Sequence, residues 1–156
     1  MQAQRIVDAC KYPPVGRRSA AFTTRAGGYS FFGGPAQIKR VNDGIAIILM
    51  IETVEAYRNV DAITGVQGID ALFIGLSDLA ISMGHPGDNH HPQVREAVDT
   101  IVGRCVRGGL GCGLLAGNAA DFHRYSEMGA KYLPMTITSL VAGALREAIA
   151  VRKSGR

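Results

Sequence analysis

The sequence lacks the features that identify membrane-spanning, secreted and zinc-binding proteins. Its longest apolar run, residues 45–51, is far shorter than the roughly 20 residues of a transmembrane helix, and the N-terminus has no apolar signal core with a cleavage site. The three cysteines, Cys10, Cys105 and Cys112, are never spaced as CxxC, which argues against a disulfide framework or a zinc site. We therefore expect a cytoplasmic protein with reduced thiols and no membrane contact.

A concentrated basic patch is also missing. The formal net charge is +4 and the pI is about 9.2, but Lys and Arg are scattered and no RNA-binding or zinc-finger signature is present. We expect no nucleic-acid partner, and small anionic substrates explain the basic balance equally well. The 156 residues are too few for a complete (β/α)8 barrel of about 250 residues, and they predict a single domain over residues 1–156.

Strand-like and helix-like segments alternate from residue 45 onward. Residues 45–51 are a β-branched apolar run typical of a strand buried on both faces of a parallel sheet. A helix over residues 54–63 follows, with Thr53 as its N-cap and Gly65 at its end. The other predicted strands are 69–75, 110–115 and 131–137, and the other predicted helices are 77–83 capped by Ser77, 92–107, a helix from Asn118 to Gly129, and 139–152.

Four β/α units in succession predict a parallel sheet with right-handed crossovers, either open and doubly wound or part of a barrel. The beginning of the chain does not fit this alternation. Residues 1–10 predict the end of a helix with no strand before it, and residues 11–35 form a Pro- and Gly-rich loop that is too long for a minimal connection. We expect part of the fold to lie upstream of residue 1.

Two carboxylates follow successive predicted strands. Glu52 and Asp78 are about one β/α unit apart, so both are expected at the carboxyl edge of the sheet, where parallel α/β folds bind ligands. Hard oxygen ligands there suit Mg²⁺ or Mn²⁺. The spacing alone equally allows each acid to cap a helix or to pair with a nearby Lys or Arg. The backbone N–H groups after Gly75 could bind an anion or form an ordinary helix start.

Several short motifs, in this order along the chain, resemble those of the HpcH/HpaI class II pyruvate aldolases. The resemblance covers about residues 5–150 and implies the C-terminal portion of a TIM (β/α)8 barrel, about four β/α units. The motifs are Lys11-Tyr-Pro-Pro14, Gly16-Arg17-Arg18, Ile51-Glu-Thr53, Phe73-Ile-Gly75, Ser77-Asp-Leu79 and Gly84-His85.

The resemblance also implies a chemistry. Glu52 and Asp78 correspond to the family's ligands for Mg²⁺ or Mn²⁺, and the backbone around Leu76, Ser77 and Asp78 corresponds to the site of the pyruvate carboxylate. The implied enzyme is a lyase that cleaves 4-hydroxy-2-oxo acids to pyruvate and an aldehyde through a metal-stabilised enolate, and that also decarboxylates oxaloacetate. The partner is therefore a small 2-oxo acid, and a homo-oligomer is expected because family members commonly assemble as hexamers.

The chain departs from the family pattern at several points. The family's catalytic His–Asp base and its substrate-binding Arg lie upstream of residue 1, so the catalytic residues of this chain are unknown. Met50 replaces a common Gln and Leu76 a common Pro, which suggests a shifted substrate preference. His85 is the best substitute base, although a surface role in its polar loop is the simpler interpretation.

Two other functions remain open. The chain is either a catalytically impaired, truncated half-barrel that needs another polypeptide, since open strand edges are a liability, or a lyase of the citrate-lyase β type that acts on CoA thioesters. Arg17, Arg18 and Arg25 either meet an acidic substrate or a neighbouring subunit, or are simple solvated loop charges.

Overall fold

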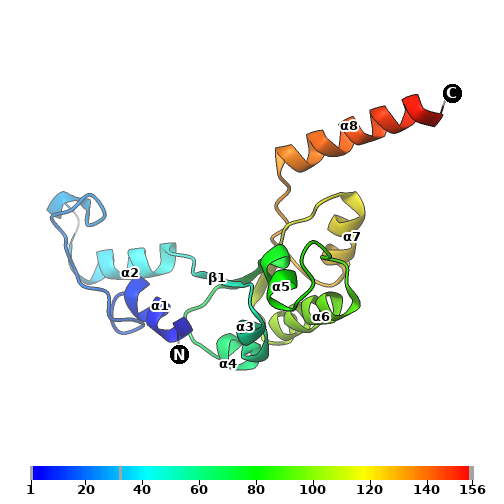
Figure 1. Cartoon of the computed structure of the whole chain (residues 1–156). Helices are drawn as coiled ribbons and strands as arrows, with labels where there is room; N and C mark the ends of the chain where they lie inside the picture. Colours follow the sequence, from blue (N-terminus) through cyan, green and yellow to red (C-terminus); the bar gives the residue numbers. More distant parts are fainter. Residues whose placement is uncertain (1, 32, 155–156) are drawn as a thin grey trace.

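Three parallel strands form the centre of the described part of the molecule (Figure 1). The computed structural model describes residues 2–31 and 33–154. The strands are β1 (Ile48–Ile51), β2 (Ala71–Ile74) and β3 (Gly111–Leu114), in the spatial order β1-β2-β3, and both pairings are parallel. The predicted α/β class with a parallel sheet is therefore confirmed.

The two faces of the sheet differ in burial. Ile51 is 1% exposed because its side chain lies on the face that the helices cover, which we call the helix face. On the opposite face, Ile48 and Met50 are 47% and 55% exposed. The prediction that residues 45–51 are buried on both faces is wrong, because only one face of β1 is covered in the described residues. We call the opposite face the inner face; its side chains come from Ile48, Met50, Ala71 and Phe73.

The predicted fourth strand, residues 131–137, is also wrong. The described backbone there forms a single bridge, between Tyr132 and Gly113. Pro134 has no N–H to continue a ladder, although its carbonyl accepts a hydrogen bond from Ala116 at 3.1 Å. The segment therefore runs beside β3 without becoming a strand.

Helices follow the strands largely as predicted. The helix predicted over residues 54–63 is divided at Asn59, whose side chain donates to the Glu55 carbonyl at 2.8 Å and competes with the helical pattern. The Thr53 cap is confirmed, since its Oγ1 accepts from the Ala56 N–H at 3.1 Å. The helices are α3 (Val54–Arg58), α4 (Val60–Thr64), α6 (Pro92–Arg107) and α7 (Ala119–Glu127), the last capped by Asn118 as predicted.

The short helix after β2 starts at Leu76, one residue before its predicted cap. α5 (Leu76–Ser82) has Gly75 at its N-cap and no side-chain cap, so the assignment of Ser77 as N-cap is wrong. Ser77 already lies within the first turn, and its Oγ accepts a hydrogen bond from the Asn89 side chain at 3.2 Å. Gly75 is favoured at this position because Glu52 lies against it, as described below.

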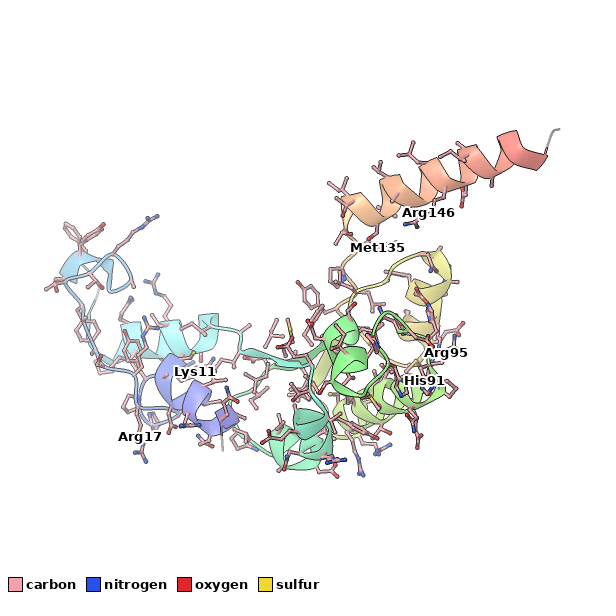
Figure 2. The ribbon with its side chains drawn as sticks, viewed as in Figure 1. Lys11, Arg17, His91, Arg95, Met135 and Arg146 are labelled. Atoms are coloured by element: carbon pink, nitrogen blue, oxygen red, sulfur yellow. The ribbon has the colours of Figure 1, made fainter. Side chains whose placement is uncertain are left out.

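The N-terminal segment contains a helix that the sequence did not indicate. The predicted helix before residue 10 is confirmed as α1 (Gln2–Cys10), and the predicted loop contains the 3₁₀ turn η1 (Gly28–Ser30). It is followed by α2 (Gly34–Gly44), and hydrogen bonds join the Asn42 side chain of this helix to the backbone of Tyr12. Lys11, buried between these helices (Figure 2), donates from Nζ to the carbonyls of Asn42, at 2.6 Å, and Ile45. This contact fixes the end of α2 to the loop after α1.

The predicted closing helix is confirmed as α8 (Ile137–Ser154) and starts two residues before the predicted Ser139. Figure 1 shows that it leaves the body of the molecule. Its large apolar side chains are exposed, from 49% at Leu140 to 79% at Ile137.

The main core lies between the helix face of the sheet and α6. Leu72, Leu114 and Ile101 are fully buried there, together with Val94 and Cys105 from α6. Within residues 2–31 and 33–154, no helix combines the length and apolarity needed to cross a membrane.

Candidate metal and carboxylate site

Glu52 directly follows β1 at the carboxyl end of the sheet. Side chains alternate along a strand, so Glu52 continues the series Ile48 and Met50 and lies on the inner face. Its position beside Gly75 agrees with the register, in which Ile51 pairs with Ile74. Glu52 is partly exposed, so its carboxylate can be reached by a ligand from the inner face.

The backbone of Gly75 makes room for this side chain. A Cβ atom on Gly75 would lie 2.8 Å from the Cβ and 3.0 Å from Oε2 of Glu52, and 3.3 Å from the sulfur of Met50. Real side chains do not approach this closely, so glycine is required if Glu52 is to keep its position. Met50, the residue in place of the family's common Gln, is therefore the apolar neighbour of the Glu52 carboxylate.

Asp78 lies in the first turn of α5, three residues after Gly75. Leu76, Ser77 and Asp78 supply the first N–H groups of this helix, which have no acceptor within a helix. Asp78 is exposed and Leu76 is half-buried. The structure thus brings Glu52 and the Leu76 to Asp78 turn to the carboxyl ends of neighbouring parallel strands.

In the part of the chain that the structure describes, neither acid caps a helix or pairs with a cation. Within the described residues, the carboxylates of Glu52 and Asp78 have no hydrogen bond and no ion pair. The cap of α3 comes from Thr53, and α5 has no side-chain cap. The geometry therefore does not support the alternative in which these acids only cap helices or pair with a Lys or Arg.

The donor set fits a divalent cation that shares its coordination with a substrate. In the described residues, no group of three or more His, Cys, Asp or Glu side chains could hold a metal ion. A fully protein-bound site is thus not available there. Mg²⁺ is commonly held by one or two carboxylates plus substrate oxygens and water, and Glu52 with Asp78 supplies two carboxylates on one rim.

One contact at this rim has no signal in the sequence. The hydroxyl of Ser82, at the end of α5, accepts a hydrogen bond from the N–H of Val54 at 3.0 Å. It joins the loop that holds Glu52 to the helix that holds Asp78. The two residues are 28 positions apart, and sequence reasoning on single elements cannot identify such a pair.

His85 is engaged away from the carboxylates. Its Nε2 lies 2.6 Å from the side-chain oxygen of Gln93, and its ring stacks on that of His91 with centroids 3.5 Å apart. Both partners belong to the start of α6, and His91 is labelled there in Figure 2. These contacts give His85 a structural role at the α5–α6 connection.

Two of the three arginines of the long loop after α1 contact other side chains. Arg17 approaches Asp8 at 3.8 Å, and the guanidinium of Arg18 lies 4.8 Å from the centre of the Tyr12 ring. Arg25 is exposed. Arg17 and Arg18 therefore interact within the N-terminal segment.

Cys105 on α6 and Cys112 on β3 are buried thiols in contact with each other. Their shared hydrogen bond, together with burial, raises the pKa of the Cys112 thiol. The raised pKa keeps the Cys112 thiol protonated. Because both side chains are buried, these cysteines belong to the core. They contribute nothing to the rim.

Comparison with known proteins identifies relatives that match most of this chain. The family described as HpcH/HpaI aldolase/citrate lyase matches residues 1–141. A 5-keto-4-deoxy-D-glucarate aldolase of Salmonella arizonae is 40% identical over 133 residues, which are 85% of this chain and 51% of that protein. The enzyme of the same name from Citrobacter koseri is 38% identical, with the same coverage.

Solved structures agree with the sequence comparison. The crystal structure of an HpcH/HpaI aldolase/citrate lyase family protein from Burkholderia cenocepacia J2315 has a TM-score of 0.82 and 28% identity, covering 97% of this chain and 60% of that one. An HpcH/HpaI aldolase from Desulfitobacterium hafniense DCB-2 has a TM-score of 0.74 and 28% identity, covering 94% and 57%. The described fold is thus part of a TIM-type barrel. The chain spans about half the length of the curated relatives it matches, and it belongs to the HpcH/HpaI aldolase/citrate lyase family.

Proposed function

We propose that this chain carries the metal-binding and pyruvate-binding part of a cytoplasmic carbon–carbon lyase that cleaves 4-hydroxy-2-oxo acids to pyruvate and an aldehyde. The observation that carries the proposal is the pair Glu52 and Asp78. These carboxylates follow neighbouring parallel strands and have no hydrogen bond or ion pair within the described residues. Membership of an aldolase and citrate lyase family supports the same reaction class.

The names of the relatives suggest the first substrate to test. Numbered from the carboxylate next to its ketone, 5-keto-4-deoxy-D-glucarate is a 4-hydroxy-2-oxo acid. In the proposed cleavage, the bond between carbons 3 and 4 breaks and its electron pair stays on carbon 3 as the enolate of pyruvate. The hydroxyl on carbon 4 loses its proton as the aldehyde forms. Protonation of carbon 3 then completes pyruvate.

Each residue of the rim has a role in this proposal. Glu52 and Asp78 hold Mg²⁺ or Mn²⁺, which when bound supplies a Lewis acid that stabilises negative charge on the keto oxygen. The N–H groups of Leu76, Ser77 and Asp78 bind the substrate carboxylate, as the family resemblance implies. Met50, which lies beside Gly75 and Glu52 on the inner face, supplies an apolar surface next to the proposed site.

Proton transfer is the step that the described residues support least. His85 is bound to Gln93 and stacked on His91, and the family's His–Asp base has no counterpart in this sequence. General acid–base catalysis commonly contributes about 10² to 10⁴-fold. We therefore expect turnover by this chain alone to be slow, while metal and pyruvate still bind.

The test separates binding from turnover. Mn²⁺ binding is measured by water-proton relaxation, and pyruvate release from 5-keto-4-deoxy-D-glucarate and from oxaloacetate is measured with Mn²⁺ or after chelation. Glu52→Gln and Asp78→Asn should lose Mn²⁺ binding. Glu55→Gln, an exposed acid in the first turn of α3, is the matched control and should bind Mn²⁺ like the native chain.

Unchanged Mn²⁺ affinity in Glu52→Gln and Asp78→Asn would refute the site. Mn²⁺ binding without pyruvate release would support the metal site and would indicate that turnover fails for lack of a catalytic base. Release of free CoA from a citramalyl-CoA thioester, without cleavage of the free acids, would replace the proposal with the citrate-lyase alternative.

We also propose a homo-oligomer that uses α8. Val141, Leu145 and Ile149 recur at intervals of four residues and are 51–58% exposed, so they form an apolar stripe on a helix that leaves the body. Light scattering after gel filtration should show an oligomer for the native chain and a smaller mass for Leu145→Glu. Equal masses would exclude α8 from the interface.

A further inference from the structure

The helix α5 contacts the segment that carries Glu52 at both of its ends. At the start of the helix, a Cβ atom on Gly75 would lie 3.0 Å from Oε2 of Glu52. At its end, the hydroxyl oxygen of Ser82 accepts a hydrogen bond from the Val54 N–H at 3.0 Å. Val54 follows Glu52 by two residues and begins α3, which lies next to α5 (Figure 1). The two contacts fix the direction of α5 relative to the segment between β1 and α3.

Asp78 lies between these two contacts and on the same side of α5 as Ser82. Residues four positions apart share a face of a helix, and Asp78 precedes Ser82 by four positions. Because Ser82 contacts Val54, this face of α5 is directed toward the segment that carries Glu52. Asp78 is exposed, so a cation can reach it there.

A purely local role for the Ser82 hydroxyl is the simpler alternative. The first N–H groups of a helix have no acceptor within that helix, and Ser82 supplies an acceptor for Val54. However, α3 already has a side-chain cap, because Thr53 Oγ1 accepts from the Ala56 N–H at 3.1 Å. The acceptor on α5 is also 28 positions away in sequence. It therefore joins two elements of the fold, besides completing the start of α3.

We propose that Ser82 is a positioning residue for the cation site. Its hydrogen bond to Val54 holds α5 and the Glu52 segment in the arrangement in which Glu52 and Asp78 can bind one divalent cation. The inference rests on the proposed function, because it requires these two carboxylates to share Mg²⁺ or Mn²⁺. Ser82 itself is not a ligand. It acts on affinity through the fraction of molecules whose carboxylates are already arranged to bind.

The first test is titration of the full chain with Mn²⁺, followed by water-proton relaxation. Ser82→Ala should bind Mn²⁺ about 3- to 10-fold more weakly, which is roughly the factor that one hydrogen bond contributes. Ser82→Thr keeps the hydroxyl and should restore most of the affinity. Ser126→Ala, the same change at an exposed serine of α7, is the matched control and should bind like the native chain. Circular dichroism verifies that each variant is folded.

The second test follows deuterium exchange at the Val54 amide with and without Mg²⁺. In the native chain, Mg²⁺ should slow this exchange, because a cation that favours the arrangement also favours the hydrogen bond within it. In Ser82→Ala, the amide should exchange faster, and Mg²⁺ should slow it less. If the hydroxyl serves only α3, Mg²⁺ will leave the Val54 exchange rate of the native chain unchanged, and the inference is wrong.

The outcomes separate this inference from the proposed site. If the native chain binds Mn²⁺, Glu52→Gln does not, and Ser82→Ala binds like the native chain, the site stands and the role of Ser82 is overturned. Weak binding by Ser82→Ala that Ser82→Thr fails to restore would also overturn it, because the hydroxyl would not be the cause. A native chain that binds no Mn²⁺ would refute the site and this inference together.

Discussion

The side chain of Glu52 lies against the α-carbon of Gly75, where a methyl group would be 3.0 Å from the Oε2 atom. Gly75→Ala should therefore displace the carboxylate while preserving its charge. We expect Mn²⁺ affinity to fall by about 10- to 100-fold, as for other substitutions that disturb a metal ligand's support. Titration with Mn²⁺ measures this, and Gly44→Ala is the control because a methyl group there meets no atom within 4 Å. Equal Mn²⁺ affinity in Gly75→Ala and Gly44→Ala would show that Gly75 does not position the Glu52 carboxylate.

His91 is predicted to stabilise the start of α6. Its Nδ1 accepts from the N–H of Gln93 at 3.3 Å. His91→Ala removes this acceptor and should lower the free energy of unfolding by about 0.5 to 2 kcal/mol, whereas His91→Ser keeps a capping oxygen and should lose less. Urea unfolding of the three proteins measures the difference. If the Ala and Ser variants unfold at the same midpoint, the cap contributes nothing.

Tyr125 should make the chain less stable in alkaline solution. Burial and the nearby Asp121 raise the pKa of its phenol, despite the opposing effect of Arg124. The folded chain then retains the proton longer than the unfolded chain, whose tyrosines titrate near about pH 10. This contribution is complete below that pH and is lost as the pH rises through the higher folded value.

Tyr125→Phe cannot titrate, so its stability should fall less steeply above about pH 10. Urea midpoints at several alkaline pH values measure the slope. Tyr132→Phe, at a position that is 52% exposed, is the control and should follow the native slope. If the stability of Tyr125→Phe falls with pH as steeply as that of the native chain, Tyr125 is not the cause of the alkaline loss of stability.

Lys11 should stabilise the junction of α1 and α2. Lys11→Met removes the donor to the partly buried Asn42 and Ile45 carbonyls, so we expect the free energy of unfolding to fall by about 1 to 3 kcal/mol. Lys39→Met removes an exposed pair with Asp43 and should change little. Thermal unfolding compares the two. A larger effect of Lys39→Met would show that the buried contact is unimportant.

Elements with local start and stop signals could be predicted from the sequence. α6 was predicted at both ends because Pro92 suits a first helical turn and Gly108 follows the last one. The sites of Glu52 and Asp78 followed from the same logic, since each comes after an apolar strand. Their position on one rim is thus encoded locally.

Features that depend on distant contacts could not be predicted. α2 has glycine at both ends and is fixed by Lys11, more than 30 positions away from the carbonyls it binds. The exposure of Met50 depends on what covers the inner face, which its apolar sequence does not reveal. Among the residues that the structure describes, Glu52 has no hydrogen-bond or ion-pair partner, and Ser82 is linked to Val54; both are likewise properties of the folded chain.

Glu52 follows β1 without an intervening residue, and Gly75 follows β2 in the same way, so the separation of the two strands sets the distance between Glu52 and the α5 turn that carries Asp78. If both carboxylates hold one cation, as we propose, the bound cation opposes separation of β1 from β2 at this end of the sheet. Cation affinity and the local stability of this strand pair would then be linked, so that a change in one changes the other by the same factor.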